Sequence, residues 1–69
     1  MQQQSTRRFL RLPEVKRQVG LGRSAIYQKI RSGEFPAPIP LSDFGRAVAW
    51  DSFAIDLWQE SRIAAARAA

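Results

Sequence analysis

Two carboxylates, Asp56 and Glu60, stand four residues apart and would lie on one face of a helix. Such a pair acts as general acid and base only inside a pocket that tunes its pKa values. The chain has 69 residues, which leaves little volume for a pocket, and it contains no histidine and no cysteine. The usual general base, the usual zinc ligands and any disulfide are therefore excluded. We interpret the pair as a solvated helix face, and we expect no enzymatic activity, no metal and no cofactor.

A second motif, Gly20 to Ala25, has the G-x-G-x-x-A spacing of a dinucleotide-binding turn. That motif binds a pyrophosphate only where a strand precedes it and a βαβ unit surrounds it. The chain is too short for such a unit, so we interpret the two glycines as a turn between helices.

The clearest chemical signal is an excess of cationic side chains. Eleven Lys and Arg stand against six Asp and Glu, which gives a formal net charge of +5, and nine of the eleven are arginine. A guanidinium binds a phosphate or a guanine edge through two parallel hydrogen bonds. The net charge alone fits a soluble, positively charged surface as well as it fits a nucleic-acid-binding protein. The distinction depends on which elements carry the cations.

Two short helices are predicted on either side of Gly20-Leu21-Gly22. Val15 and Val19 share one helical face, and Ile26 and Ile30 restart the same i, i+4 pattern after the turn. The second helix should begin near the second glycine and stop at Ser32-Gly33. This pattern is typical of a helix-turn-helix, whose second helix enters the major groove of DNA.

A β-hairpin should follow the second helix. The alternating prolines exclude a helix and favour an extended strand at a sheet edge: Pro36, Pro38 and Pro40. Phe44, in the turn over residues 42–45, would either plug the core or wedge against a DNA sugar edge. Near the N-terminus, an apolar segment could add a further edge strand or plug the core: Phe9, Leu10 and Leu12.

The second strand of the hairpin is expected over residues 46–50. Its alternation places Val48 and Trp50 inward, with Ala47 and Ala49 on the opposite face. Asp51 or Ser52 should then cap a third helix, because both side chains accept hydrogen bonds from the first turn.

The third helix carries two apolar stripes. The first should face the core and contains Ala54, Ile55, Trp58 and Ala65; the second lies about a third of a turn away and contains Phe53, Leu57 and Ala64. A domain of this size should not cover both. The second stripe therefore predicts a homodimer or a head-to-tail oligomer. In the alternative, the Phe9-Leu10 segment folds over it and the protein is a monomer.

The predicted DNA-binding residues lie on the second helix and on the hairpin. The N-terminus of that helix offers free N–H groups to phosphate, and arginine and glutamine suit guanine and adenine edges. The tyrosine would contact a phosphate or sugar, or else lie half-buried under the hairpin. Lys29 and Arg31, nearer the end of the helix, suit phosphate contacts better than base contacts. The full set is Gly22, Arg23, Ser24, Tyr27, Gln28, Lys29, Arg31 and Arg46.

The ordered fragments RFLRLPEV, VGLGRSAIY, RSGEFPAPI and GRAVAW resemble the AlpA family of small prophage regulators, over nearly all of residues 7–62. The resemblance implies a mainly α fold with a small β-hairpin, a winged helix-turn-helix of three helices plus a two-stranded wing. It also implies double-stranded DNA as the partner, and a role in activating integrase-type genes or directing excision. The family pattern usually has serine at position 22 and a polar residue at 53, where this chain has Gly22 and Phe53; these departures bear on the helix cap and on oligomerisation.

We expect one domain over residues 7–62, between a disordered tail over 1–6 and a frayed helix end over 63–69. The sequence contains no apolar run near the ~20 residues of a membrane span, and residues 1–6 do not form a signal peptide. A cytoplasmic, nucleoid-associated protein of bacterial or phage origin is expected. The alternative function is a small protein-interaction module, such as an anti-repressor, that places its basic face on an acidic partner.

Overall fold

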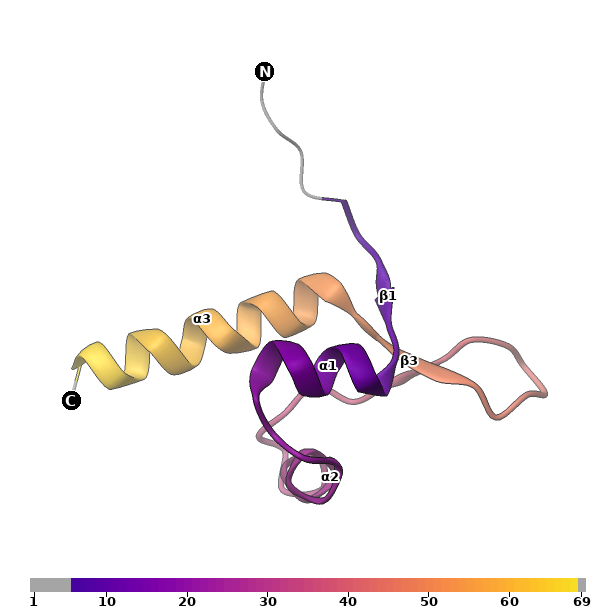
Figure 1. Cartoon of the computed structure of the whole chain (residues 1–69), viewed down its shortest axis with the longest axis horizontal. Coiled ribbons are helices and arrows are strands. Elements are labelled where there is room, and N and C mark those ends of the chain that lie inside the picture. The colour runs from indigo at the N-terminus through magenta and orange to yellow at the C-terminus, as the bar shows by residue number, and fades with distance from the viewer. Residues whose placement is uncertain (1–5, 69) are drawn as a thin grey trace.

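A computed structural model describes residues 6–68, which form three helices and one small antiparallel sheet (Figure 1). The elements are β1 (Phe9–Leu10), α1 (Leu12–Val19), α2 (Arg23–Arg31), β2 (Ile39–Pro40), β3 (Val48–Asp51) and α3 (Ser52–Ala68). The mainly α class with a winged helix-turn-helix arrangement is confirmed. Of the expected disordered tail, residues 1–5 lie outside the described residues, as does residue 69 at the expected frayed end.

The sheet has three strands, one more than the expected two-stranded wing. β3 is central and pairs antiparallel with β1 on one side and with β2 on the other. Of the two roles left open for the N-terminal apolar segment, the edge strand is confirmed for Phe9 and Leu10. The Ser52 N–H donates to the Arg8 carbonyl at 2.9 Å, and the Arg8 N–H donates to the Ser52 hydroxyl at 2.8 Å. These bonds fix β1 beside the start of α3.

The expected alternation along the second strand is wrong at one position. Trp50 is buried as predicted, but Ala49 on the opposite face is buried too, and the strand begins at Val48. β3 is flanked by a strand on each side, and Ala49 lies opposite Ile39 in the β2 pairing. Larger neighbouring side chains cover a single methyl group even on the outer face of a central strand.

One apolar core joins the helices to the sheet. Each helix contributes a fully buried residue on the predicted face (Val15, Ile26 and Ile55), and these pack with Leu10, Phe35 and Trp50. Both indoles satisfy their polar atom: Trp50 Nε1 donates to the Pro36 carbonyl at 2.9 Å, and Trp58 Nε1 to the Glu34 carbonyl at 2.8 Å. The segment between α2 and β2 is therefore tied to the core by two tryptophans.

The turn between α1 and α2 depends on two glycines in different backbone conformations. Gly20 adopts a left-handed φ of 76°, and its N–H closes α1 on the Lys16 carbonyl at 2.9 Å. Gly22 is extended, with φ −81° and ψ 172°, and starts α2 without a side-chain cap. Only the first position needs glycine, because an L side chain is strained in the left-handed region.

α3 begins as predicted and then leaves the body of the domain. The Asp51 carboxylate accepts the Phe53 N–H at 3.0 Å, which confirms the cap. Ile55 is buried, but every described residue from position 61 to 68 is exposed, so the placement of Ala65 in the core is wrong. The helix runs past the ends of α1 and α2, where no other element of residues 6–68 covers it (Figure 1).

The second stripe of α3 is only partly covered. Phe53 is half-buried under Arg7, whose guanidinium carbon lies 4.6 Å from the ring centroid. Leu57 remains 67% exposed and Ala64 is exposed. The N-terminal segment thus covers the start of the stripe and leaves the rest open.

The wing loop connects β2 to β3 over residues 41–47. The Leu41 N–H donates to the Ala47 carbonyl at 2.9 Å, and the Gly45 N–H donates to the Ser42 hydroxyl at 3.0 Å. Phe44 at the tip is 100% exposed, so the core plug expected as one of its roles is wrong. The closed loop displays this ring to solvent.

The two glycines of the turn should respond to the same substitution in opposite ways. Gly22→Ser should raise the free energy of unfolding by about 0.5–1 kcal/mol, because the hydroxyl caps α2 and the position is open space. Gly20→Ser should lower it by about 1–2 kcal/mol, because of its positive φ. Urea unfolding of the two variants beside the parent chain measures both; equal shifts would contradict this account of the turn.

Candidate nucleic-acid interface

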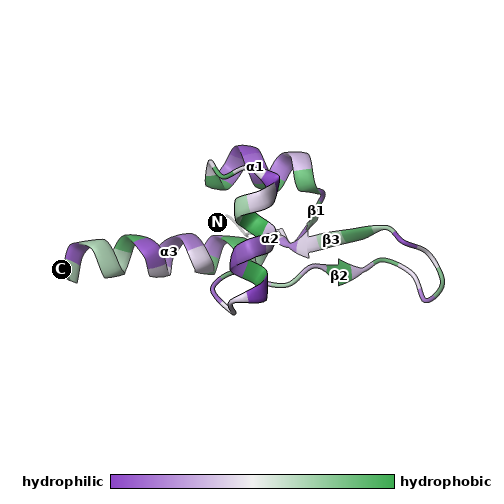
Figure 2. Cartoon of the chain, turned by 90° about the horizontal axis from the view of Figure 1, so that it is seen from below, coloured by the Kyte–Doolittle hydropathy of each residue, from purple (hydrophilic) through white to green (hydrophobic). Residues whose placement is uncertain are grey.

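α2 separates an apolar side from a polar side. Ile26 is fully buried and Ile30 packs against the core, while Ser24, Gln28 and Arg31 on the other side are exposed. Figure 2, in which hydrophilic residues are purple and hydrophobic ones green, shows both kinds of residue alternating around this short helix. Gln28 lies midway between the two isoleucines along the helix and so at the centre of the exposed side.

Tyr27 links the exposed side of α2 to the sheet. Its ring meets Trp50 edge-on, with centroids 6.2 Å apart and an interplanar angle of 71°. The Arg23 guanidinium carbon lies 5.4 Å from the Tyr27 centroid on the helix's first turn. The prediction that Tyr27 is half-buried is confirmed. Its ring supports Arg23 on the first turn of α2, the part of a recognition helix that usually contacts bases.

A shallow hollow of about 280 Å³ adjoins this stack and is lined by Arg23, Ser24, Tyr27 and Arg31. Beside it, the N-terminus of α2 carries uncapped donors. The first intrahelical bond runs from the Ile26 N–H to the Gly22 carbonyl at 3.0 Å, which leaves the preceding N–H groups without a helical partner. Such donors, at the positive end of the helix dipole, suit a phosphate oxygen.

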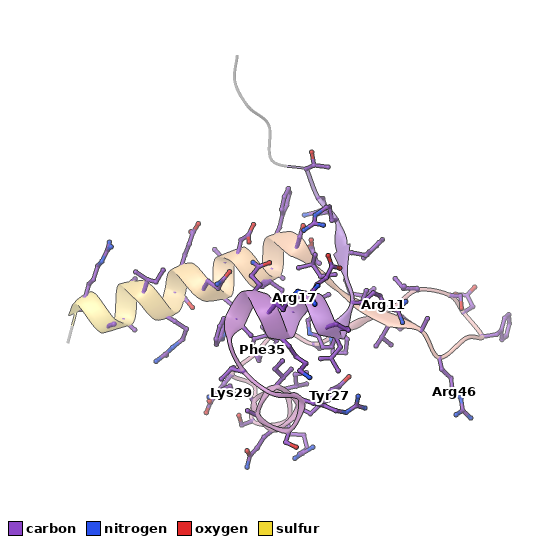
Figure 3. All side chains as sticks on the ribbon, viewed as in Figure 1. Arg11, Arg17, Tyr27, Lys29, Phe35 and Arg46 are labelled. Atoms are coloured by element: carbon purple, nitrogen blue, oxygen red, sulfur yellow. The ribbon has the colours of Figure 1, made fainter. Side chains whose placement is uncertain are left out.

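Lys29 is set apart from these residues. Figure 3 shows Lys29 and Tyr27 on opposite sides of α2, which is seen end-on. The Lys29 ammonium lies 3.7 Å from a Glu34 carboxylate oxygen. The structure therefore gives this predicted phosphate contact a carboxylate partner that the other α2 cations lack.

Arg46 extends from the wing. It is exposed and forms no ion pair among residues 6–68. In Figure 3 its side chain points to the side of the molecule that α2 occupies. The wing thus adds one cation to the same side, at a distance along the molecule from the α2 cluster.

Two cations that the sequence reasoning missed lie on α1. Lys16 and Arg17 are exposed and, within the described part of the chain, have no ion-pair partner. Gln18 faces α3, where its amide donates to Asp56 at 3.0 Å and to Gln59 at 2.7 Å. Lys16, two residues earlier, is on the opposite flank of α1. Both cations could have been predicted from the sequence, because the first helix of a helix-turn-helix crosses the DNA backbone.

The acidic residues neutralise cations away from α2's exposed face. Arg7 pairs with Asp51 at 3.2 Å and Arg8 with Glu14 at 3.6 Å, both beside β1. Across residues 6–68, no three side chains of His, Cys, Asp or Glu lie together in a group that could hold a metal ion. None of the helices in that range is long and apolar enough to cross a membrane.

Comparison with known proteins agrees with the resemblance seen in the fragments. Residues 8–63 match the family described as Prophage CP4-57 regulatory protein (AlpA). The uncharacterized protein ORF88 of Enterobacteria phage P4 is 49% identical over 57 residues, covering 83% of this chain and 62% of the phage protein. The chain thus spans about three-fifths of the length of that relative. No solved structure matches. The family match extends from β1 into α3, across the whole helix-turn-helix and wing, and the chain belongs to the AlpA family of prophage regulatory proteins.

Proposed function

We propose that this protein binds double-stranded DNA, with α2 in the major groove and the wing on the adjacent backbone. The observation that carries the proposal is the exposed side of α2, where Arg23 and Arg31 line one hollow and have no acidic partner among the described residues. An α-helix fits the major groove, and cations that are not internally neutralised release counterions when they meet phosphate.

The residues divide into readers and anchors by their place on α2. Arg23 and Gln28, on the first two turns, suit guanine and adenine edges. Ser24 and the free N–H groups after Gly22 would hold a phosphate at the helix N-terminus. The remaining contacts are charge contacts to the backbone, made by Lys16, Arg31 and Arg46, and by Lys29 where a phosphate displaces Glu34.

On this basis the chain regulates prophage genes, either as an activator of integrase-type genes or as a factor that directs excision. Both roles use the same docking surface, and both place the protein in the bacterial cytoplasm at the nucleoid. A second candidate is an anti-repressor that sets the same cations on an acidic protein. Binding to duplex DNA with no other protein present separates the two functions.

The first test is the salt dependence of binding. A duplex selected from a random library and an unselected duplex are titrated from low to physiological salt. The slope of log affinity against log salt should gain about −0.9 for each phosphate contact. Arg46→Ala should make the slope shallower by about 0.9, the contribution of one phosphate contact. Arg67→Ala, near the far end of α3, is the matched control and should leave it unchanged. Affinity that stays flat across salt would sink the electrostatic account of binding.

The second test separates readers from anchors. Gln28→Ala or Arg23→Ala should reduce the preference for the selected duplex by about 1–3 kcal/mol, the value of one well-read base pair. Arg46→Ala should weaken both duplexes alike, because a phosphate contact carries no sequence information. Competition binding with the two duplexes measures the ratio.

Unfolding of Arg23→Ala is followed in parallel, since this arginine also packs on Tyr27. If both reader variants keep the parent's ratio of selected to unselected binding, α2 is not the reading element.

A further inference from the structure

An apolar groove of about 500 Å³ runs between the α1–α2 turn and α3. Val19, Leu21, Trp58 and Ile63 form its apolar lining, and Ile63 is 51% exposed. Its polar lining consists of Gln59, Arg62 and the ion pair between Lys29 and Glu34, and Arg62 itself has no ion pair among residues 6–68. The groove is large enough for an aromatic side chain, and the described residues leave it open.

The wing tip has the complementary chemistry. Phe44 is fully exposed, and the preceding residue, Asp43, is an exposed carboxylate that forms no ion pair in the described part of the chain. The tip is held closed by the bond from the Gly45 N–H to the Ser42 hydroxyl. A β-carbon at Gly45 would lie 2.5 Å from that hydroxyl oxygen, so any larger residue there would displace the Ser42 side chain and break this bond. The ring is thus presented on a defined turn.

We infer that the wing tip of one copy docks in the α1–α2/α3 groove of the next copy, with Phe44 in the groove and Asp43 beside Arg62. The inference rests on the proposed DNA binding, which supplies the template for the array. The two surfaces lie on different parts of the chain, so a head-to-tail contact leaves one tip and one groove free for further copies. Both Figure 1 and Figure 2 place the wing and the far end of α3 at opposite ends of the molecule.

Charge decides between a protein groove and DNA as the occupant of the tip. A carboxylate beside the ring would meet phosphate repulsion if Phe44 wedged into a DNA groove, whereas Arg62 attracts it in the neighbouring protein. Arg46, on the same loop, points toward the α2 side and stays available for phosphate. The wing therefore divides its contacts between a neighbour at the tip and DNA closer to the sheet.

The contact is too small to hold two copies together in solution. One aromatic side chain and one rim ion pair bury far less than the roughly 1,600 Å² of a stable interface. Two copies on one duplex are held at high effective concentration, where a small contact suffices. The molecule's longest dimension, 43 Å, is comparable with the roughly 34–36 Å of one DNA turn, so copies bound about one turn apart lie within reach of each other. Copies in a direct repeat would then face the same side of the duplex.

The decisive measurement is cooperativity on duplexes carrying two copies of the selected site. A direct repeat about one helical turn apart should show about tenfold cooperativity, the order expected from burying one phenylalanine. Phe44→Ala should abolish it and leave single-site affinity unchanged. Phe9→Ala, an exposed phenylalanine on β1, is the matched control and should retain it. An inverted repeat should show none.

Each contrary outcome has a distinct meaning. Weaker single-site binding by Phe44→Ala would place the ring on DNA and overturn the inference. Cooperativity lost with Leu57→Glu but kept with Phe44→Ala would move the contact to the second stripe of α3. Absence of any single-site binding would reject the proposed function instead.

A charge swap tests the pairing directly. Asp43→Arg and Arg62→Asp should each remove cooperativity, and the double variant should restore it; Arg67→Asp controls for the change in net charge. Because the chain has no cysteine, Asp43→Cys and Arg62→Cys copies can also be mixed on the duplex that carries the direct repeat and treated with a short bismaleimide. The mixed dimer should exceed either self-linked product by well over the twofold excess that random pairing gives. A mixed dimer at or below that twofold excess, or failure of the double variant to recover cooperativity, would overturn the inference.

Discussion

The fold depends on the burial of Trp50 at the centre of β3. Its ring joins the apolar side of α2 to the core, and its indole N–H holds the Pro36 carbonyl at 2.9 Å. The same ring meets Tyr27 edge-on, and Tyr27 in turn supports Arg23. The orientation of a surface arginine on α2 is therefore fixed, through two aromatic contacts, by a fully buried residue of the sheet. In so small a domain, one side chain serves both the core and the interface.

The distribution of acidic residues defines the cationic surface as much as the arginines do. Asp51 and Glu14 pair with Arg7 and Arg8 beside β1, and Glu34 pairs with Lys29 on the α3 flank of α2. Those pairs are largely solvent-exposed, so each adds little stability. Their larger effect is to lower the net charge on two sides of the molecule. The side that carries Arg23 and Arg31 then retains its full charge, which concentrates the attraction for an anionic partner there.

Sequence periodicity predicted those parts of the fold that repeat along the chain. The i, i+4 pairs placed Val15 and Ile26 in the core, and the glycines marked both helix ends. It failed where burial depends on distant neighbours. Ala49 is buried in the central strand, where β2 pairs with it through Ile39, and Ala65 is exposed because no other element within residues 6–68 covers it. Neither fact has a local signal. Six of the eight predicted site residues lie together on α2's exposed side or at its N-terminus, whereas Lys29 is set apart by Glu34, which the turn after α2 brings back beside it.

The wing shows how a short chain can carry two surfaces on one hairpin. β2 is an edge strand of two residues, and its proline removes a backbone donor that would otherwise invite another strand. Association through the sheet edge is thereby disfavoured, and the loop beyond it is left as the projecting feature. Because the phenylalanine of this loop is exposed, the folded state lacks the hydrophobic stabilisation that the same side chain would contribute in a core. A chain of 69 residues has few aromatic side chains to leave unburied, and this one stands beside Asp43, which has no ion pair within residues 6–68. The combination is better explained by a partner that covers the ring than by folding, since the ring is fully exposed in the described part of the chain.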